Sequence, residues 1–212
     1  MQTPTFAEGL ADRYQRFDAF LKKLRGDIYP EPPTQLHIGL TQKMFAELNK
    51  HYPQPAGAKV LDVGCGQGLA LEMFRAAGLD PLGVTLGPDV EVCRSRGLNV
   101  QEMDFAFLDF PDASFDLVWC RHAIEHSIFP LFTLAELTRV LKPGGVLYLE
   151  VPAPDTACRH QTNPNHYSVL GKSMWLELIR RSGFPEVRIF DLNFTVPAGP
   201  DTYWAFLQQK PA

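Results

Sequence analysis

The stretch VLDVGCGQG, residues 60–68, decides the fold of this chain. A short apolar run containing Asp62 ends in glycines at alternate positions, Gly64, Gly66 and Gly68, as a buried strand does when it stops in a tight turn. Glycine has no Cβ, so the turn can take positive φ and let a ligand lie on the backbone, while the amides that open the next helix face that ligand. The dinucleotide fingerprint Gly-x-Gly-x-x-Gly would need its third glycine at Leu69, which disfavours a dehydrogenase.

Composition points to a globular protein with a small-molecule ligand. The 212 residues fit one domain, 45% of them are hydrophobic and 21% charged, and the net charge is −4, so no basic excess is available to neutralise nucleic acid. The cysteines have no Cys-x-x-Cys spacing and no His at zinc-finger spacing, so we expect no metal site and no disulfide framework. No leader or membrane-spanning apolar stretch is evident, and we expect a cytoplasmic protein.

Strand and helix patterns alternate after the glycine turn. Strands are predicted over 81–86, 98–103, 115–120 and 146–151, with helices over 69–78, 88–96, 131–141 and 172–182. Such alternation predicts a mostly parallel sheet of the Rossmann-like kind, with ligands at the carboxyl ends of its strands. The last two strands, 187–194 and 202–208, are joined by a link too short for a parallel crossover, so we expect an antiparallel hairpin and seven strands in all.

The segments that flank this core are predicted to complete the ligand site. Helices over 6–24 and 36–48 make residues 1–55 an N-terminal helical cap on a core of 56–212, within a single domain. They either cover the ligand edge of the sheet or pack on an outer helix. The polar segment 152–168 is longer than most loops, and we expect a lid there.

Several further segments have the order and spacing of a known family. They are MDF at 103–105, LDFPDASFD at 108–116, CRHAIEH at 120–126, LTRVLKPGG at 137–145 and HYS at 166–168. Together with the glycine turn, they make residues 59–183 resemble class I S-adenosylmethionine-dependent methyltransferases, of the broad type 11 and type 23 groups. The resemblance implies the Rossmann-like methyltransferase fold.

The resemblance also implies how the cofactor is held. Gly64 and Gly66 would lie against its methionine and ribose portions, and Asp62 would orient the turn and the amino group. Asp104 would accept a hydrogen bond from the adenine amine. The full set implied for cofactor binding is Asp62, Gly64, Cys65, Gly66, Gly68, Thr85, Leu86, Asp104, Phe105 and Cys120.

One position departs from the pattern. Most relatives end the second strand in an acid that takes both ribose hydroxyls, whereas this chain has Thr85, which can hold one. The sequence GVTL at 83–86 is also similar to cyclopropane fatty acid synthases, a minor alternative that would attach the methyl carbon to an alkene.

Two histidines are the candidates for a general base. His122 follows the fourth predicted strand and His166 lies in the polar segment, and histidine titrates near working pH. His126 would share a face with His122, either for structure or for contact with substrate, and Tyr167 and His37 are further candidates for substrate binding. The His122 and His126 pair lacks further metal ligands.

The sequence therefore predicts methyl transfer from S-adenosylmethionine to an oxygen, carbon or nitrogen of a small metabolite, with S-adenosylhomocysteine as product. No Asn/Asp-Pro-Pro-Tyr/Phe motif follows strand four, which argues against exocyclic amines as acceptors. Because every motif concerns the cofactor, an inactive S-adenosylmethionine-binding partner protein is the alternative. The motifs specify neither the acceptor nor an oligomeric state.

Overall fold

The computed structural model describes residues 6–25, 30 and 32–212, and its centre is a seven-stranded sheet in the order β3-β2-β1-β4-β5-β7-β6. The strands are β1 (Lys59–Val63), β2 (Asp80–Thr85), β3 (Val100–Glu102), β4 (Phe115–Arg121), β5 (Leu141–Pro152), β6 (Arg188–Val196) and β7 (Gly199–Gln209). β1 pairs in parallel with β2 on one side and with β4 on the other. The chain therefore switches sides of the sheet at β1, and ligands bind beyond the carboxyl ends of strands at such a point.

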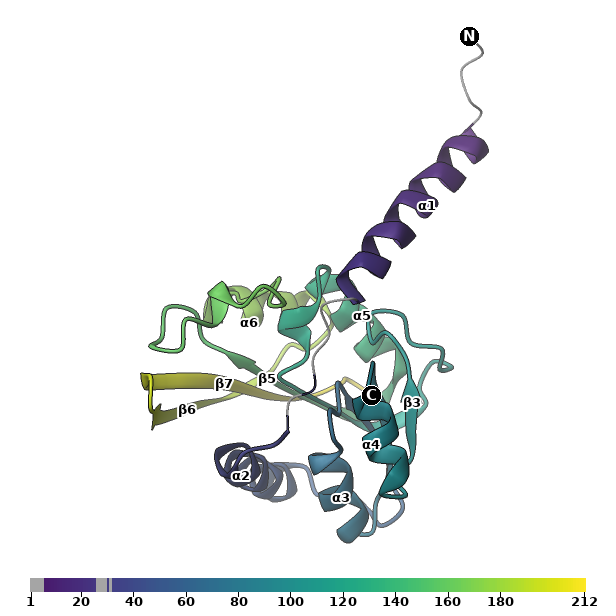
Figure 1. The fold of residues 1–212 in the computed structure, drawn as a ribbon. Helices are drawn as coiled ribbons and strands as arrows, with labels where there is room; N and C mark the ends of the chain where they lie inside the picture. The colour runs from purple at the N-terminus through teal and green to yellow at the C-terminus, as the bar shows by residue number, and fades with distance from the viewer. Residues whose placement is uncertain (1–5, 26–29, 31) are drawn as a thin grey trace.

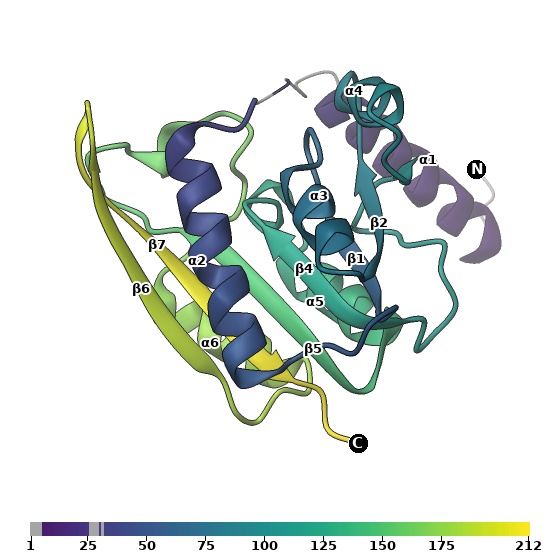
Figure 2. The ribbon, with the colours of Figure 1, turned by 90° about the horizontal axis from the view of Figure 1, so that it is seen from below.

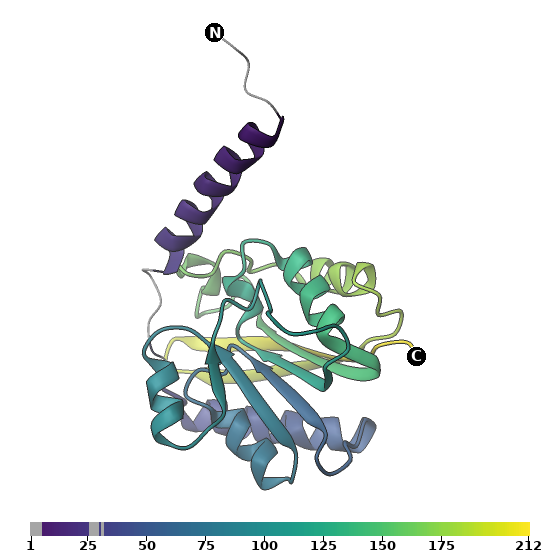
Figure 3. The ribbon, with the colours of Figure 1, turned by 90° about the vertical axis from the view of Figure 1, so that its right-hand side faces the viewer.

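Helices cover both faces of this sheet (Figure 1). The helices of the described residues are α1 (Phe6–Arg25), which projects away from the sheet, and α2 (Gln35–His51), α3 (Leu69–Ala76), α4 (Asp89–Ser95), α5 (Pro130–Val140) and α6 (Lys172–Arg181), with the short 3-10 turns η1 (Ile124–His126) and η2 (His160–Thr162). Figure 3 shows α5 and α6 on one side of the sheet and α2, α3 and α4 on the other. The predicted Rossmann-like arrangement is confirmed.

Each central strand contributes side chains to two hydrophobic cores, because successive side chains of a strand point to opposite faces of the sheet. In β1, Leu61 joins the core beneath α5 and α6, whereas Val60 joins the core beneath α2 and α3. Trp119 of β4 and Tyr148 of β5 stack in the second core with ring centroids 3.7 Å apart. Burial on both faces explains why residues 115–120 form an almost continuous apolar run.

The C-terminal strands confirm the predicted hairpin. β7 pairs antiparallel with β6 and with β5. β5 begins at Leu141, five residues before the predicted start at Val146. The strand continues past Gly144, whose φ is positive, because Gly144 and Gly145 exchange hydrogen bonds with Lys210, at 3.0 and 2.8 Å.

The two N-terminal helices have different positions. α2 lies across β5, β7 and β6 (Figure 2), with Met44 and Leu48 fully buried, so it is part of a core layer, and its first turn, at His37, reaches the ligand edge. α1 runs outward from the ligand edge, and its Phe17 ring contacts Phe107 and Phe129. No helix among the described residues is both long and apolar enough to cross a membrane.

Candidate active site

A cavity of about 400 Å³ opens at the carboxyl ends of β1, β2 and β4, where the sheet order predicts a ligand. Its lining combines the turn after β1, the end of β2, the segment after β3, η1, the segment before α6, and parts of the N-terminal helices. The sequence-predicted residues that the structure brings together there are Gly64, Cys65, Gly66, Thr85, Leu86, Asp104, Phe105, His122, His126, His166, Tyr167 and His37. Asp62, Gly68 and Cys120 are not in the lining.

The three glycines of the turn all have positive φ, and their surroundings show a different role for each of them. A Cβ on Gly64 would lie 2.4 Å from the Cβ of Ala123, so this glycine lets the ends of β1 and β4 meet. A Cβ on Gly68 would lie 2.3 Å from Leu98, which is a packing requirement. Around Gly66 the nearest atom to a Cβ is 3.9 Å away, so its backbone borders open space in the cavity. Gly66 is therefore the glycine on which a ligand can lie.

Asp62 and Cys120 lie behind this lining, within the sheet. Cys120 is fully buried in β4 and paired with Val63 on one side and Leu149 on the other. Asp62 Oδ2 has no hydrogen-bond partner among the described residues, and burial raises the pKa of Asp62 to about 8. Its side chain is therefore mostly protonated at neutral pH.

The β2 and β3 end of the cavity supplies neutral and acidic oxygen atoms. Thr85 ends β2, as predicted. Asp104 Oδ1 accepts from the Ala106 amide at 3.0 Å, which fixes the carboxylate in the turn after β3. Asp89, which the sequence analysis did not select, also lines the cavity and accepts from Gln67 Nε2 at 3.2 Å.

The β4 and β5 end contains a buried network of charges. Glu150 is fully buried, with Arg121 Nε 2.9 Å and His122 Nε2 3.1 Å from its Oε1, while its Oε2 accepts from the Tyr148 hydroxyl. Burial alone would raise the pKa of Glu150, but the Arg121 charge and the His122 and Tyr148 hydrogen bonds lower it to about 2.

His122 lies between two carboxylates. Its Nδ1 is 3.3 Å from Glu125 Oε1, and its Nε2 faces Glu150. Burial opposes a charged ring, yet Glu125 and Glu150 raise the pKa of His122 above its usual value. Both ring nitrogens lie within ion-pair distance of a carboxylate oxygen, which favours the protonated ring.

His126 and His166 have a different environment. His126 Nδ1 is 2.9 Å from the carbonyl oxygen of Asn165, and His166 Nδ1 is 3.0 Å from that of His160. A carbonyl only accepts, so each Nδ1 carries the proton and each Nε2 of the neutral ring keeps a lone pair. Burial is the largest cause that lowers the pKa of His166, which favours its neutral form.

The remaining substrate candidates are less deeply placed. Tyr167 is exposed at the cavity rim. His37 lies in the first turn of α2, where its Nδ1 accepts from the Thr34 amide in a capping box.

The predicted lid segment is anchored at both ends. The amides of Ala153 and Ala157 donate to carbonyls of Thr202 and Pro200, at 2.9 and 3.1 Å. At the other end, Ser168 donates from its amide to Glu125 O at 2.9 Å and from its hydroxyl to Ser127 O at 2.6 Å. In this structure the segment is a wall of the cavity.

Sequence reasoning missed the charged network, although a signal was present. Arg121 and Glu150 are charged residues at the carboxyl ends of β4 and β5, directly after apolar runs. Glu125 lies inside the segment CRHAIEH that carried the resemblance. A charged residue where a buried parallel strand ends is a site candidate, because that edge of the sheet binds ligands.

Comparison with known proteins gives several matches. The model of a family described as Methyltransferase domain, type 11, matches residues 61–149. The chain is 39% identical over 101 residues to a ubiquinone biosynthesis O-methyltransferase of Methylococcus capsulatus, covering 44% of this chain and 43% of that protein. It is 30% identical over 177 residues to a 2-methyl-6-phytyl-1,4-hydroquinone methyltransferase of Synechocystis, covering 71% of this chain and 54% of that protein. The chain thus spans about half the length of these curated relatives.

A solved structure shares the fold. A SAM dependent methyltransferase from Archaeoglobus fulgidus superposes with a TM-score of 0.67 at 20% sequence identity, covering 80% of this chain and 94% of that one.

Proposed function

Because the chain belongs to the methyltransferase-domain family, we propose that it transfers a methyl group from S-adenosylmethionine to a small-molecule acceptor and releases S-adenosylhomocysteine. The observation that carries the proposal is the turn at Gly66, which has φ +49° and open space beside its backbone at the switch point of the sheet. We take residues 1–212 to act as one domain in the cytoplasm, which agrees with four unpaired cysteines.

The residues around this turn fit the cofactor. Gly66 leaves room for the methionine and ribose portions, and the unpartnered Asp62 Oδ2 behind the turn can accept from an amino group, directly or through water. The Thr85 hydroxyl at the end of β2 can hold one ribose hydroxyl, and Asp104 can accept from the adenine amine. The other proposed contacts are Gly64, Cys65, Leu86 and Phe105 in the lining, with Gly68 and Cys120 as supporting residues.

When bound, S-adenosylmethionine supplies an electrophilic methyl group on a sulfonium. Methyl transfer then needs an acceptor atom positioned in line with the methyl group, so positioning can supply much of the rate. The cavity wall made by the segment before α6 surrounds the β4 side, where the acceptor would lie. Exclusion of water there strengthens the electrostatic interactions of the site.

We further propose His166 as the residue that accepts the acceptor's proton when the acceptor is a hydroxyl. Its Nε2 keeps a lone pair and it lines the cavity, whereas both nitrogens of His122 face carboxylates. His122 is then a positioning residue, placed between the carboxylates of Glu125 and Glu150. His126, Tyr167 and His37 remain the proposed substrate contacts.

Calorimetry with S-adenosylhomocysteine tests the cofactor site. One molecule should bind per chain, NAD should not bind, and Gly66→Val should abolish binding because its side chain would occupy the ligand's place. Gly78→Val is the matched control, since Gly78 also has positive φ but no atom within 4 Å of its Cβ position. Equal binding by the Gly66→Val and wild-type proteins would contradict the site.

Labelled S-adenosylmethionine and a panel of acceptors test the activity. Hydroquinones and phenols come first in the panel, because the names of the two curated relatives point to quinone chemistry. A methylated product that carries the label supports the proposal. Cofactor binding without any methylated product would favour the inactive partner protein. His166→Ala should lower kcat by about 10²–10⁴-fold.

A further inference from the structure

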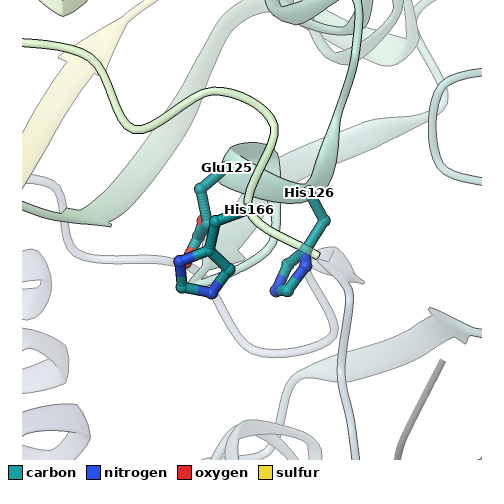
Figure 4. A group of neighbouring side chains, drawn as sticks. All are labelled: Glu125, His126 and His166. Atoms are coloured by element: carbon teal, nitrogen blue, oxygen red, sulfur yellow. The ribbon is translucent and has the colours of Figure 1, made fainter. Parts of the chain in front are cut away.

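Three potential metal ligands meet on the acceptor side of the cavity. Glu125 and His126 come from η1, and His166 comes from the segment before α6, 40 residues later in the chain. One donor atom from each lies within 4.8 Å of the others. Figure 4 shows the two imidazole rings side by side, with the Glu125 carboxylate behind His166.

Both imidazoles are oriented as metal ligands are. Histidines that bind metals usually donate the other ring N–H to a carbonyl or carboxylate, which fixes the tautomer and the ring plane. Here His126 Nδ1 faces Asn165 O at 2.9 Å and His166 Nδ1 faces His160 O at 3.0 Å. The two Nε2 lone pairs are therefore available to a cation.

Glu125 supplies the negative charge. Its side chain is 1% exposed, and its Oε2 is buried without a hydrogen-bond partner among the described residues. Its Oε1 is 3.3 Å from His122 Nδ1. An unpartnered buried carboxylate oxygen is costly, and a cation beside it would remove that cost.

A second cluster shows the contrast. Cys158, His160 and Asp201 also lie within 4.8 Å of one another. However, His160 Nε2 already faces the Asp201 carboxylate at 2.9 Å, and Asp201 also accepts from the Thr202 amide at 2.8 Å. The Asp201 carboxylate is therefore already satisfied by donors of the protein, in contrast to Glu125 Oε2.

We propose that Glu125, His126 and His166 bind one divalent transition-metal ion, for which Zn²⁺ is the suitable probe. Two imidazole nitrogens and one carboxylate oxygen suit zinc, and three protein ligands leave a position open for an external oxygen. Zinc binds such donors at about 2.0–2.2 Å, which places the ligand atoms of a tetrahedral site about 3.4 Å apart, so donors that now lie within 4.8 Å of one another move closer together when the ion binds.

The inference rests on the proposed function and deepens it, because the three ligands lie on the side of the cavity where the acceptor would bind. A hydroxyl acceptor that binds the ion loses its proton to water more easily, since the ion stabilises the alkoxide or phenolate. The oxygen then forms the bond to the methyl carbon as the carbon–sulfur bond breaks, and S-adenosylhomocysteine leaves. With the ion bound, the His166 lone pair is occupied, so His166 acts as a ligand and the proton goes to solvent.

Equilibrium dialysis of the full chain against Zn²⁺, after removal of metals with a chelator, tests the site. We expect one zinc per chain, and His126→Gln and His166→Gln should each weaken binding at least about 10-fold. His51→Gln is the matched control, because His51 lies at the end of α2 and should leave zinc binding unchanged. Cys158→Ala should also leave it unchanged. Melting curves identify variants that fail to fold.

Two results would overturn the metal site: absence of zinc uptake by the wild-type chain, or uptake that is lost in Cys158→Ala and retained in both histidine variants. Calorimetry with S-adenosylhomocysteine on the metal-free protein separates the two proposals. Tight cofactor binding without zinc uptake would remove only the metal site. Zinc uptake without cofactor binding would remove the proposed function and leave the site.

Discussion

Behind each half of the cavity a buried carboxylate lies on a central strand of the sheet. The pKa of one carboxylate is raised and that of the other is lowered. Asp62, behind the glycine turn of β1, has an unpartnered Oδ2 and a pKa raised to about 8 by burial. Glu150, at the end of β5, is just as buried, but Arg121, His122 and Tyr148 surround it and its pKa falls to about 2. Burial alone therefore does not set the charge of a strand-end acid. The neighbouring cations do.

The largest expected effect concerns Glu150. Replacing it by Gln leaves Arg121 and His122 buried beside a neutral group, and breaking a buried pair in this way costs about 3–5 kcal/mol. We expect Glu150→Gln to lower the free energy of unfolding by that amount in urea denaturation. Glu177→Gln, which removes an exposed pair with Arg181, should cost only about 0.3–0.5 kcal/mol.

The pH dependence of Glu150 follows from its lowered pKa. Because the folded-state value is about 2 and the usual value is 4.5, its stabilisation is fully present above pH 4.5 and is lost as the pH falls toward 2. Stability of the wild-type protein should therefore fall over that range more steeply than that of Glu150→Gln. Parallel curves would contradict the pairing.

Asp62 should make the free energy of unfolding change with pH in the opposite direction. Its raised folded-state pKa means that its contribution is fully present below 3.8 and is lost as the pH rises toward 8. Between pH 5 and 7 this amounts to about 2–3 kcal/mol of unfolding free energy, and Asp62→Asn should remove that part of the slope. The control is Asp116→Asn, because Asp116 is paired with Lys142 and its pKa is lowered.

A pair of glycine variants separates packing from ligand contact. Gly64→Ala and Gly66→Ala share the strain of a positive φ, about 1–2 kcal/mol. Only Gly64→Ala also forces a methyl group against Ala123, which should cost about 1–3 kcal/mol more in unfolding free energy. Equal losses in the two variants would mean that the β1 and β4 ends can separate freely.

The smallest effect is expected at Thr85. If its hydroxyl holds one ribose hydroxyl, Thr85→Val should weaken S-adenosylhomocysteine binding by about 1 kcal/mol, measured by calorimetry. Melting temperature is the control readout and should change little. An unchanged dissociation constant would place the ribose on other residues, of which Asp89 is a charged candidate in the lining.

The two halves also differ in how far the sequence predicts them. In the cofactor half, the site residues end a strand or directly follow one in the sequence. The glycine spacing at 64–68 and the position of Thr85 were therefore enough to place these residues at the strand ends. The acceptor half depends on contacts between distant segments. His122 was predicted as a base from its place after β4, but its ring state is set by Glu125 and by Glu150, which is 28 residues away in the chain.

Long-range packing also determines which surface each N-terminal helix covers. Amphipathic patterns predicted both helices correctly, yet they did not indicate which surface each would cover. α2 buries Met44 and Leu48 on the sheet, and this choice depends on the space left beside α3 by the order of the strands.

The anchored wall before α6 has a consequence for how acceptor preference can evolve. Hydrogen bonds fix it at Ala153 and Ala157 on one side and at Ser168 on the other, while Gln161, Thr162 and Pro164 between them are exposed. Closing a flexible loop of twice the length costs only about 0.6 kcal/mol more. Insertions between these anchors can therefore reshape the mouth of the cavity at little thermodynamic cost, while the sheet and the glycine turn stay unaltered.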